Sequence, residues 1–263
     1  MTEDSEKRSI LVSSALPYAN APLHLGHILE HIQTDIWVRY QRLIGNDVVY
    51  VCADDAHGTP IMLKADELNM TPEELIAEMY ESHTSVFKKF NISHDNYHST
   101  HSEENELLSQ KIFLALQDKG LIEKKEIDQL YDTSKEMFLS DRYVKGICPS
   151  CGADDQYGDN CEKCSATYNA IELKNPVSVL SNTAPIVRKS EHLFFKLSLL
   201  KDEISSWLDT SFVQSSVRNK LNEWLNDDLK DWDISRDSPY FGFKIPGYDD
   251  KYFYVWLDAP IGY

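Results

Sequence analysis

The chain has few basic residues and no long apolar run, and each absence excludes a class of protein. Its 263 residues include 26 Lys and Arg against 43 Asp and Glu, which gives a formal net charge of −17. A surface this acidic repels nucleic acid, so any contact with RNA must use a local patch or a shaped pocket. A membrane-spanning helix needs about 18 consecutive apolar residues and none occurs, while the polar start MTEDSEKRSI is no signal peptide. We therefore expect a cytoplasmic protein without a membrane segment.

Cysteine is scarce as well, and its distribution predicts a metal site. All but one of the 5 cysteines form two C-x-x-C pairs, in CPSCG and CEKCS. In a chain without a secretory signal this spacing favours zinc, with two disulfides or idle thiols as the alternative. Four thiolates complete a tetrahedron and leave no open position, so we expect one structural Zn²⁺ bound by Cys148, Cys151, Cys161 and Cys164. The remaining cysteine, Cys52, is expected in the core.

The glycine-rich loops that bind phosphates in many nucleotide folds, G-x-G-x-x-G and G-x-x-x-x-G-K-[ST], are also absent. A pair of histidines, His24 and His27, occupies the corresponding place in a predicted βαβ unit. The apolar stretch 9–16 predicts a strand, the apolar spacing over 25–45 predicts a helix, and the β-branched run 47–55 predicts a second strand. The two strands of such a unit are expected to be parallel.

The first turn of that helix is a natural phosphate site, because its free N–H groups and its dipole attract anions. Side chains three residues apart share a face, so His24 and His27 can point at one triphosphate. Gly26 between them leaves room for a ligand against the backbone. Imidazole N–H donors would stabilise the charge that builds up on a reacting phosphoryl group. The spacing alone is a weak signal, since HSTH repeats it at His98 and His101.

The central part of the chain predicts two more helices and then an insertion. Thr71, Pro72 and Glu74 predict a capped helix that continues to about Phe90. From about Gly120 the hydrophobic groups are short and alternate with charged turns, as in an insertion. The helix expected between these two regions should bury its regularly spaced apolar residues, Leu107, Leu108, Ile112 and Leu116.

The C-terminal third predicts a mixture of strands and helices. The stretch 191–197 is strand-like, and helical patterns cover 199–208 and 217–229. The residue pattern over 238–263 is again typical of strands, with PGYDD as a hairpin turn.

Five stretches in this order resemble the bacterial methionyl-tRNA synthetases, which are class I aminoacyl-tRNA synthetases. They are ALPYANAPLHLGH with its H-x-G-H signature, ADDAHGTPI, the four-cysteine segment, WDISRD and YFYVWLDAPIGY. The resemblance covers essentially the whole chain. It implies an α/β fold with a Rossmann-like parallel sheet, interrupted by a connective insertion with a zinc knuckle. The first catalytic half would cover 1–118, the insertion 119–232 with its knuckle at about 143–168, and the start of the second half 233–263.

The resemblance also implies an activity and its residues. The family activates methionine with ATP to methionyl-adenylate and transfers the methionyl group to the 3′ end of tRNA(Met), including the initiator, for protein synthesis. His24 and His27 match the catalytic pair that binds ATP, which carries Mg²⁺. Gly26 is expected to lie against the same ATP, and Arg236 is expected to contact ATP or the acceptor end of the tRNA. Asp55 matches the acid that binds the α-ammonium group of methionine. The residues that match the family's methionine pocket are Leu16, Tyr18, Trp256, Ala259, Pro260 and Tyr263. The aromatic rings among them suit the thioether of methionine.

Plainer roles exist for several of these residues. Asp55 could instead belong to a turn or cap a helix. The aromatic residues of the pocket could be plain core, and Arg236 could form a surface salt bridge. The family's lysine-rich signature K-M-S-K-S and its anticodon-reading domain are absent, and the similar triplet in DTSKE lies in the insertion. We therefore expect an N-terminal portion of a longer enzyme, inactive alone, whose oligomeric state depends on the absent C-terminal region. The alternative is a catalytically inactive zinc-knuckle fragment that binds RNA or protein.

Overall fold

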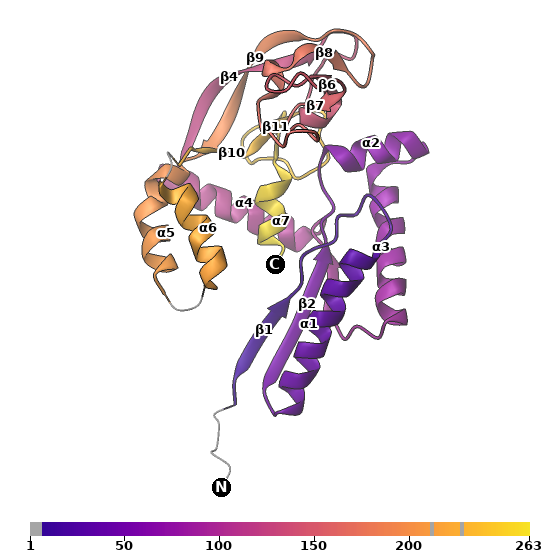
Figure 1. The fold of residues 1–263 in the computed structure, drawn as a ribbon, viewed down its shortest axis with the longest axis vertical. Coiled ribbons are helices and arrows are strands. Elements are labelled where there is room, and N and C mark those ends of the chain that lie inside the picture. The colour runs from indigo at the N-terminus through magenta and orange to yellow at the C-terminus, as the bar shows by residue number, and fades with distance from the viewer. Residues whose placement is uncertain (1–6, 211–212, 227–228) are drawn as a thin grey trace. The chain divides into compact units, whose positions relative to one another are not determined.

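The structure is a computed structural model, which describes residues 7–210, 213–226 and 229–263 (Figure 1). The chain forms two compact units. The first comprises the residues up to Ser109 together with Tyr240–Phe243 and Val255–Tyr263. The second comprises Gln110–Pro239 and Lys244–Tyr254. Each unit therefore combines segments that are far apart in the sequence.

A three-stranded parallel sheet with the order β1-β2-β3 is the framework of the first unit, and Figure 1 shows β1 and β2 side by side. Helix α1 (Leu25–Leu43) joins β1 (Ser9–Ser13) to β2 (Asp47–Asp54), so the predicted βαβ unit and the α/β fold class are confirmed. The third strand, β3 (Asn96–Ser99), pairs with the end of β2. The sequence did not predict β3, because NYHS is short and lacks apolar alternation.

Helix α1 has its predicted position, but the apolar spacing that predicts it does not mark its buried side. Ile36 and Leu43 are exposed, Leu43 at 84%. Asp35 is buried instead, and its carboxylate accepts a hydrogen bond from the Ser93 N–H at 2.7 Å. A polar group can be buried at little energetic cost when it is hydrogen-bonded. The buried side chains of the helix are thus apolar and polar together: Ile28, His31, Asp35, Val38 and Gln41.

Helix α4 (Glu103–Asp118) differs from the prediction in the same way. Of the apolar residues expected to face inward, Leu107, Leu108 and Ile112 are exposed and Leu116 is half-buried. The buried side chains are Asn105, Ser109 and Phe113. The Asn105 amide donates a hydrogen bond to the Thr100 carbonyl at 2.9 Å, so this polar residue has a partner inside. The expected inward face is therefore wrong.

Two helices, α2 (Thr59–Leu68) and α3 (Pro72–Lys89), pack on one apolar cluster of the first unit. The predicted cap of α3 is confirmed. The Thr71 hydroxyl accepts a hydrogen bond from the Glu74 N–H at 3.2 Å, and the Thr71 N–H donates to the Glu74 carboxylate at 2.9 Å. Pro72 occupies the first turn, as the sequence predicts.

The second unit contains a long antiparallel pair, β4 (Ile122–Asp132) and β9 (Ile186–Phe195) (Figure 1). These strands belong to a sheet with the order β10-β9-β4-β5, and a separate sheet with the order β7-β6-β8 lies in the cysteine-containing part. The strand predicted at 191–197 is confirmed. The sequence did not predict β4, because charged residues occupy 123–126 and hide its alternation.

The other elements of this unit are short. Helix α5 confirms the helical pattern at 199–208, and α6 confirms that at 217–229 as far as Asn226, while positions 227 and 228 lie outside the described residues. None of the helices formed by the described residues is both long and apolar enough to cross a lipid bilayer. The remaining bounds are β5 (Met137–Phe138), β6 (Val144–Ile147), β7 (Gln156–Tyr157), β8 (Lys174–Ser178), α5 (Lys201–Leu208), α6 (Ser215–Asn226), β10 (Trp232–Asp233), β11 (Ser235–Asp237), β12 (Lys251–Phe253), and 3₁₀ turns at Asp141–Tyr143, Ala170–Glu172 and Leu197–Leu200.

The tail agrees with the strand prediction only in its first part. Lys244 pairs with Tyr252 across the PGYDD turn, as predicted. From Val255 onward the chain forms helix α7 (Val255–Ile261), so the strand prediction is wrong there. The physical reason is the spacing of the buried residues, since Val255, Asp258 and Ala259 follow a helical period.

The cap of α3 should contribute measurably to stability. Thr71→Ala removes the hydroxyl acceptor and leaves an N–H group at the helix start without its partner. We expect the free energy of unfolding, measured by chemical denaturation, to fall by about 1 kcal/mol. Thr71→Ser keeps the hydroxyl and is the control. An alanine variant as stable as the serine variant would show that the cap contributes nothing.

Candidate functional site

The two predicted histidines lie together on the first turn of α1. His24 is the N-cap, and its Nδ1 accepts hydrogen bonds from the backbone N–H groups of Gly26 at 3.1 Å and His27 at 3.4 Å. In return, the Nδ1 of His27 accepts from the backbone N–H of His24 at 3.3 Å. The two rings stack, with centroids 3.7 Å apart and planes inclined by 14°. Both imidazoles therefore share one face, as their spacing predicts.

These hydrogen bonds also determine which nitrogen of each ring carries the proton. A neutral imidazole whose Nδ1 accepts is protonated on Nε2, so both rings keep an Nε2–H donor. Burial and then the neighbouring His24 lower the pKa of His27, which favours its neutral form. A Cβ atom at Gly26 would lie 2.9 Å from Cε1 of His24, so glycine allows the ring to cap the helix. This structural reason for Gly26 was not predicted.

Asp55 directly follows β2 and lies beside the segment that leads into α1. Its N–H donates to the Pro17 carbonyl, and its carbonyl accepts from the Ala19 N–H, both at 2.8 Å. Its Oδ1 atom is buried and has no hydrogen-bond partner among the described residues. Burial and then the charge of Asp258 raise the pKa of Asp55 to about 7, although a hydrogen bond from the His57 N–H opposes the rise. Such a carboxylate is suited to a cationic ligand.

Two of the predicted pocket residues come from opposite ends of the sequence and meet in the first unit. The Leu16 N–H donates a hydrogen bond to the Tyr263 hydroxyl at 3.0 Å, across 247 residues of sequence. The Tyr18 hydroxyl donates to the carbonyl of His57 at 2.7 Å. The segment before α1 is therefore linked both to the end of the chain and to the residues that follow β2.

Three further predicted pocket residues lie on α7. Ala259 is buried, whereas Trp256 and Pro260 are exposed. Trp256 is 59% exposed and Tyr263 is 54% exposed. Plain core packing, the alternative for this aromatic cluster, does not describe these two side chains. Their exposed rings are available to a ligand.

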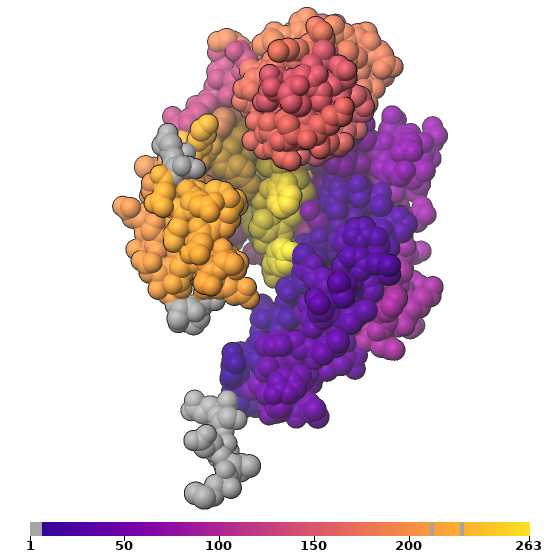
Figure 2. Space-filling view, in the orientation of Figure 1, coloured from indigo at the N-terminus to yellow at the C-terminus, as the bar shows by residue number. Residues whose placement is uncertain are grey.

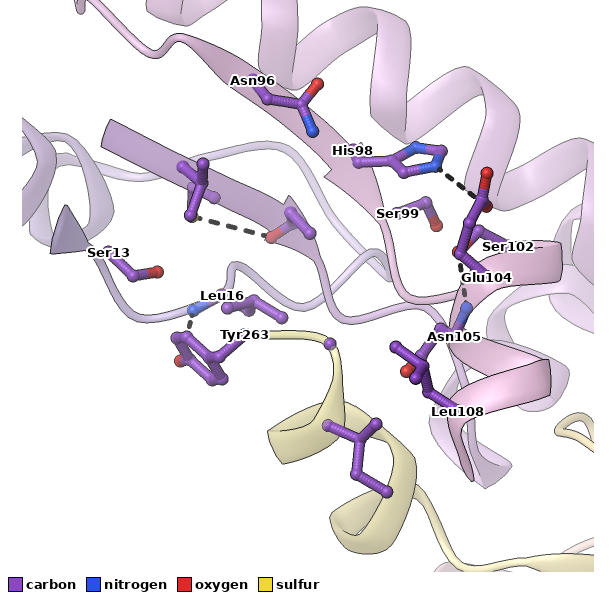
Figure 3. A pocket seen from close by; sticks show the side chains of 15 residues that line it. Ser13, Leu16, Asn96, His98, Ser99, Ser102, Glu104, Asn105, Leu108 and Tyr263 are labelled. Carbon is purple, nitrogen blue, oxygen red and sulfur yellow. Dashed lines mark hydrogen bonds and ion pairs between the residues drawn. The ribbon is translucent and has the colours of Figure 1, made fainter. Parts of the chain in front are cut away.

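A cavity of about 240 Å³ opens beside part of this set (Figure 3). Leu16 and Tyr263 line it together with polar side chains from β3 and the start of α4, such as His98 and Asn105. His98 lies 3.7 Å from the Glu104 carboxylate. The HSTH stretch therefore borders this cavity, although its histidine spacing gave no reason to expect it there.

Arg236 belongs to the second unit, on β11. Its guanidinium lies over the Tyr254 ring, 3.8 Å from the centroid, and 3.6 Å from the Asp233 carboxylate. It also donates a hydrogen bond to the Ser235 carbonyl at 2.6 Å. The ion pair given as its alternative role is thus present, and its contact with ATP stays a prediction.

The four predicted cysteine ligands form one cluster in the second unit. All are free thiols, and their Sγ atoms lie within 4.8 Å of one another, so the cluster could hold a metal ion. Two Sγ–Sγ distances are 3.9 Å, between Cys148 and Cys164, and 3.6 Å, between Cys151 and Cys161. Sulfur ligands about 2.3 Å from a tetrahedral zinc are about 3.8 Å apart, so the geometry fits this ion. Figure 2 shows this part of the chain as a rounded knob of rose-coloured atoms.

Backbone hydrogen bonds reach two of these sulfur atoms. The N–H groups of Cys151 and Cys164 donate to the sulfurs of Cys148 and Cys161, both at 3.4 Å. The bond from Cys151 is the largest of the causes that lower the pKa of Cys148 to about 6, which favours its metal-binding thiolate form. At Cys164 a hydrogen bond from the Ala166 backbone lowers the pKa, but hydrogen bonds with Cys151 and Cys161 outweigh it and raise the pKa to about 12.

A second group of potential ligands, His31, Cys52 and His94, lies in the interior of the first unit. Its two imidazoles hydrogen-bond to each other at 3.3 Å. Burial lowers the pKa of both histidines to about 4 and raises that of the Cys52 thiol to about 12. We interpret the group as a neutral, hydrogen-bonded part of the core, in line with the role predicted for Cys52.

Three residues near Asp55 were not predicted. His57 is buried, its Nδ1 pairs with the Asp258 carboxylate, and its Nε2 lies 2.9 Å from Nδ1 of His101. All three stand in quoted stretches, ADDAHGTPI, HSTH and YFYVWLDAPIGY. Their contacts join positions far apart in the sequence, so no local pattern reveals them.

Two solved structures resemble this chain. A Mycobacterium tuberculosis methionyl-tRNA synthetase in complex with methionyl-adenylate has a TM-score of 0.73 and 22% sequence identity, over 97% of this chain and 46% of that chain. A crystal structure of Mycobacterium tuberculosis methionyl-tRNA synthetase bound by methionyl-adenylate has a TM-score of 0.72 and 22% identity, over 98% and 46% of the two chains. The chain thus spans about half the length of these proteins and shares their fold.

A family model described as tRNA synthetases class I (M) matches residues 10–263. The match covers nearly the whole chain, including the histidine pair, the four cysteines and α7. It agrees with the resemblance carried by the five sequence stretches. The chain therefore belongs to this family of class I tRNA synthetases.

Proposed function

We propose that this chain is the methionine- and ATP-binding part of a methionine–tRNA ligase. Such a ligase activates methionine with Mg²⁺-bound ATP to methionyl-adenylate. It then transfers the methionyl group to the 3′ end of tRNA(Met), the initiator included, during protein synthesis in the cytoplasm. Family membership supports the ligase chemistry, and both similar structures hold methionyl-adenylate.

The observation that carries the proposal is the carboxylate of Asp55. Its Oδ1 is buried and has no partner in the described part of the chain, and an unsatisfied buried acceptor is energetically costly. The α-ammonium group of an amino acid would supply N–H donors and a positive charge at this point. The capping alternative does not apply to the next helix, because Gly58 is the N-cap of α2.

We assign the methionine side chain to the apolar and aromatic residues of the first unit. The hydrogen bond between Leu16 and Tyr263 holds two of these residues together. The exposed ring of Trp256 offers an aromatic face to a ligand. A thioether beside aromatic rings gains about 1 kcal/mol, which helps to select methionine over leucine. The assigned residues are Leu16, Tyr18, Trp256, Ala259, Pro260 and Tyr263.

We assign the phosphates of ATP to the N-terminus of α1. In the activation step a carboxylate oxygen of methionine bonds to the α-phosphorus, and the bond to the oxygen of the leaving pyrophosphate breaks. The Nε2–H donors of His24 and His27 would stabilise the charge that spreads over the phosphate oxygens, an effect worth about 10²–10³ in rate for one donor. Gly26 keeps the His24 ring in its capping position. Arg236 is assigned a further contact with ATP.

We assign one structural zinc to Cys148, Cys151, Cys161 and Cys164. Four protein ligands leave no open position, so the ion would stabilise the fold of its segment and take no part in the reaction. The Sγ–Sγ distances support this assignment.

Methionine binding by the chain tests the proposal. We expect calorimetry near pH 8 to detect binding of methionine to the chain. Leucine should bind about tenfold or more weakly, because an apolar pocket discriminates between such similar side chains by about 1–3 kcal/mol. Asp55→Asn removes the charge that the ammonium group needs and should abolish this binding. Asp47→Asn, at the exposed start of the same strand, is the matched control and should bind normally. Equal binding of leucine, or none of methionine, would favour the alternative of an RNA- or protein-binding fragment.

Methionine binding should also depend on pH. Burial and the charge of Asp258 raise the pKa of Asp55 to about 7, so the carboxylate that binds the ammonium group is lost as the pH falls through this value. We expect the affinity to be highest near pH 8 and to fall about tenfold per unit well below pH 7. Calorimetry between about pH 5.5 and about pH 8, from about one and a half units below the midpoint to about one unit above it, measures the profile. A flat profile would exclude Asp55 as the ammonium ligand.

Metal analysis tests the cysteine assignment. We expect about one zinc per chain in protein purified without chelator, and loss of folded structure in the segment when a chelator removes the ion. Cys148→Ser should bring the zinc content close to zero, whereas Cys52→Ser should leave it unchanged. A zinc content near zero in the unsubstituted protein would refute the assignment.

A further inference from the structure

His57 contacts three separate parts of the proposed methionine site. It is fully buried, two residues after Asp55, and its N–H donates to the Asp55 carboxylate. Its carbonyl accepts the hydroxyl proton of Tyr18 at 2.7 Å. Its ring pairs through Nδ1 with the carboxylate of Asp258 on α7. One residue thus connects the acid, the segment before α1, and the helix that carries Trp256.

The His57–Asp258 pair is enclosed by the protein. Both side chains have 0% exposure. The His57 ring lies nearly perpendicular to the Phe243 ring, with centroids 4.5 Å apart. The Asn105 amide donates a hydrogen bond to the Asp258 carbonyl at 3.2 Å. Breaking a buried polar pair of this kind leaves an uncompensated group and is strongly destabilising, so the contact fixes the position of α7 in this unit.

A second hydrogen bond extends the pair toward solvent. Because the Nδ1–H of His57 donates to the carboxylate, the Nε2 of a neutral ring is an acceptor. Nδ1 of His101 lies 2.9 Å from it and is the donor. Partial burial and then His57 lower the pKa of His101, which keeps this ring neutral. His101 is exposed to solvent. The chain of hydrogen bonds from Asp258 through His57 to His101 therefore links a buried carboxylate to the surface.

We propose that His57 is a positioning residue of the methionine site, which keeps α7, Asp55 and Tyr18 in place relative to one another. His57 holds α7 through its ring and holds Asp55 and Tyr18 through its backbone. The inference rests on the proposed function for the identity of the ligand.

Two substitutions of His57 test the positioning role. In His57→Asn the amide nitrogen lies near the place of Nδ1 and can still donate to Asp258, whereas the longer side chain of His57→Gln places its amide near Nε2. We expect His57→Gln to lose about tenfold or more in methionine affinity, the value of one charge-assisted hydrogen bond, and His57→Asn to retain most of it. Circular dichroism verifies folding. Equal, wild-type affinity in both variants would overturn the positioning role.

The failure of this inference is distinguishable from the failure of the proposed function. If the unsubstituted chain binds no methionine at any pH, the proposed function fails. If the unsubstituted chain binds methionine and both His57→Gln and His57→Asn bind it with the same affinity, the inference alone is refuted.

Discussion

The parallel pairing of β1 with β2 is the interaction on which the first unit depends. It continues beyond β1 as a bridge between Tyr18 and Asp55, closed by two backbone hydrogen bonds of 2.8 Å. This extension places the acid beside the segment that leads into α1. Parallel strands end at the same edge of their sheet, and ligands of α/β folds bind outside that edge. The histidine pair at the start of α1 and the carboxylate of Asp55 therefore belong to one edge.

The buried acids at this edge differ in the partners of their carboxylates. Asp54 is paired with His83 and Tyr97, and Asp258 is paired with His57. Each pairing satisfies one oxygen, while Oδ2 of Asp54 and Oδ1 of Asp258 lack a partner among the described residues, as Oδ1 of Asp55 does. The Asp55 carboxylate accepts a hydrogen bond from the backbone N–H of His57, and burial raises its pKa to about 7. A cation that binds there would supply the opposite charge, which is why the proposed function rests on this residue.

Local signals predicted some of this structure, and longer-range contacts determined the rest. The strand–helix–strand unit, the Thr71 cap and the cysteine cluster follow from short periods and spacings, so the sequence predicts them. Strand β3 and helix α7 are polar or short, and their conformation depends on neighbours from other parts of the chain. Within the site, the histidine pair is local and was predicted. The His57–Asp258 pair joins positions 201 residues apart, which no local pattern contains.

A crystal structure of the chain with bound methionine would test the central claim most directly. We predict that the α-ammonium nitrogen lies about 3 Å from the Asp55 carboxylate, within hydrogen-bond distance of Oδ1. The thioether should contact the rings of Trp256 or Tyr263. Methionine bound elsewhere in the chain, with Oδ1 of Asp55 still lacking a partner, would contradict the claim that this carboxylate is the recognition point for the amino acid.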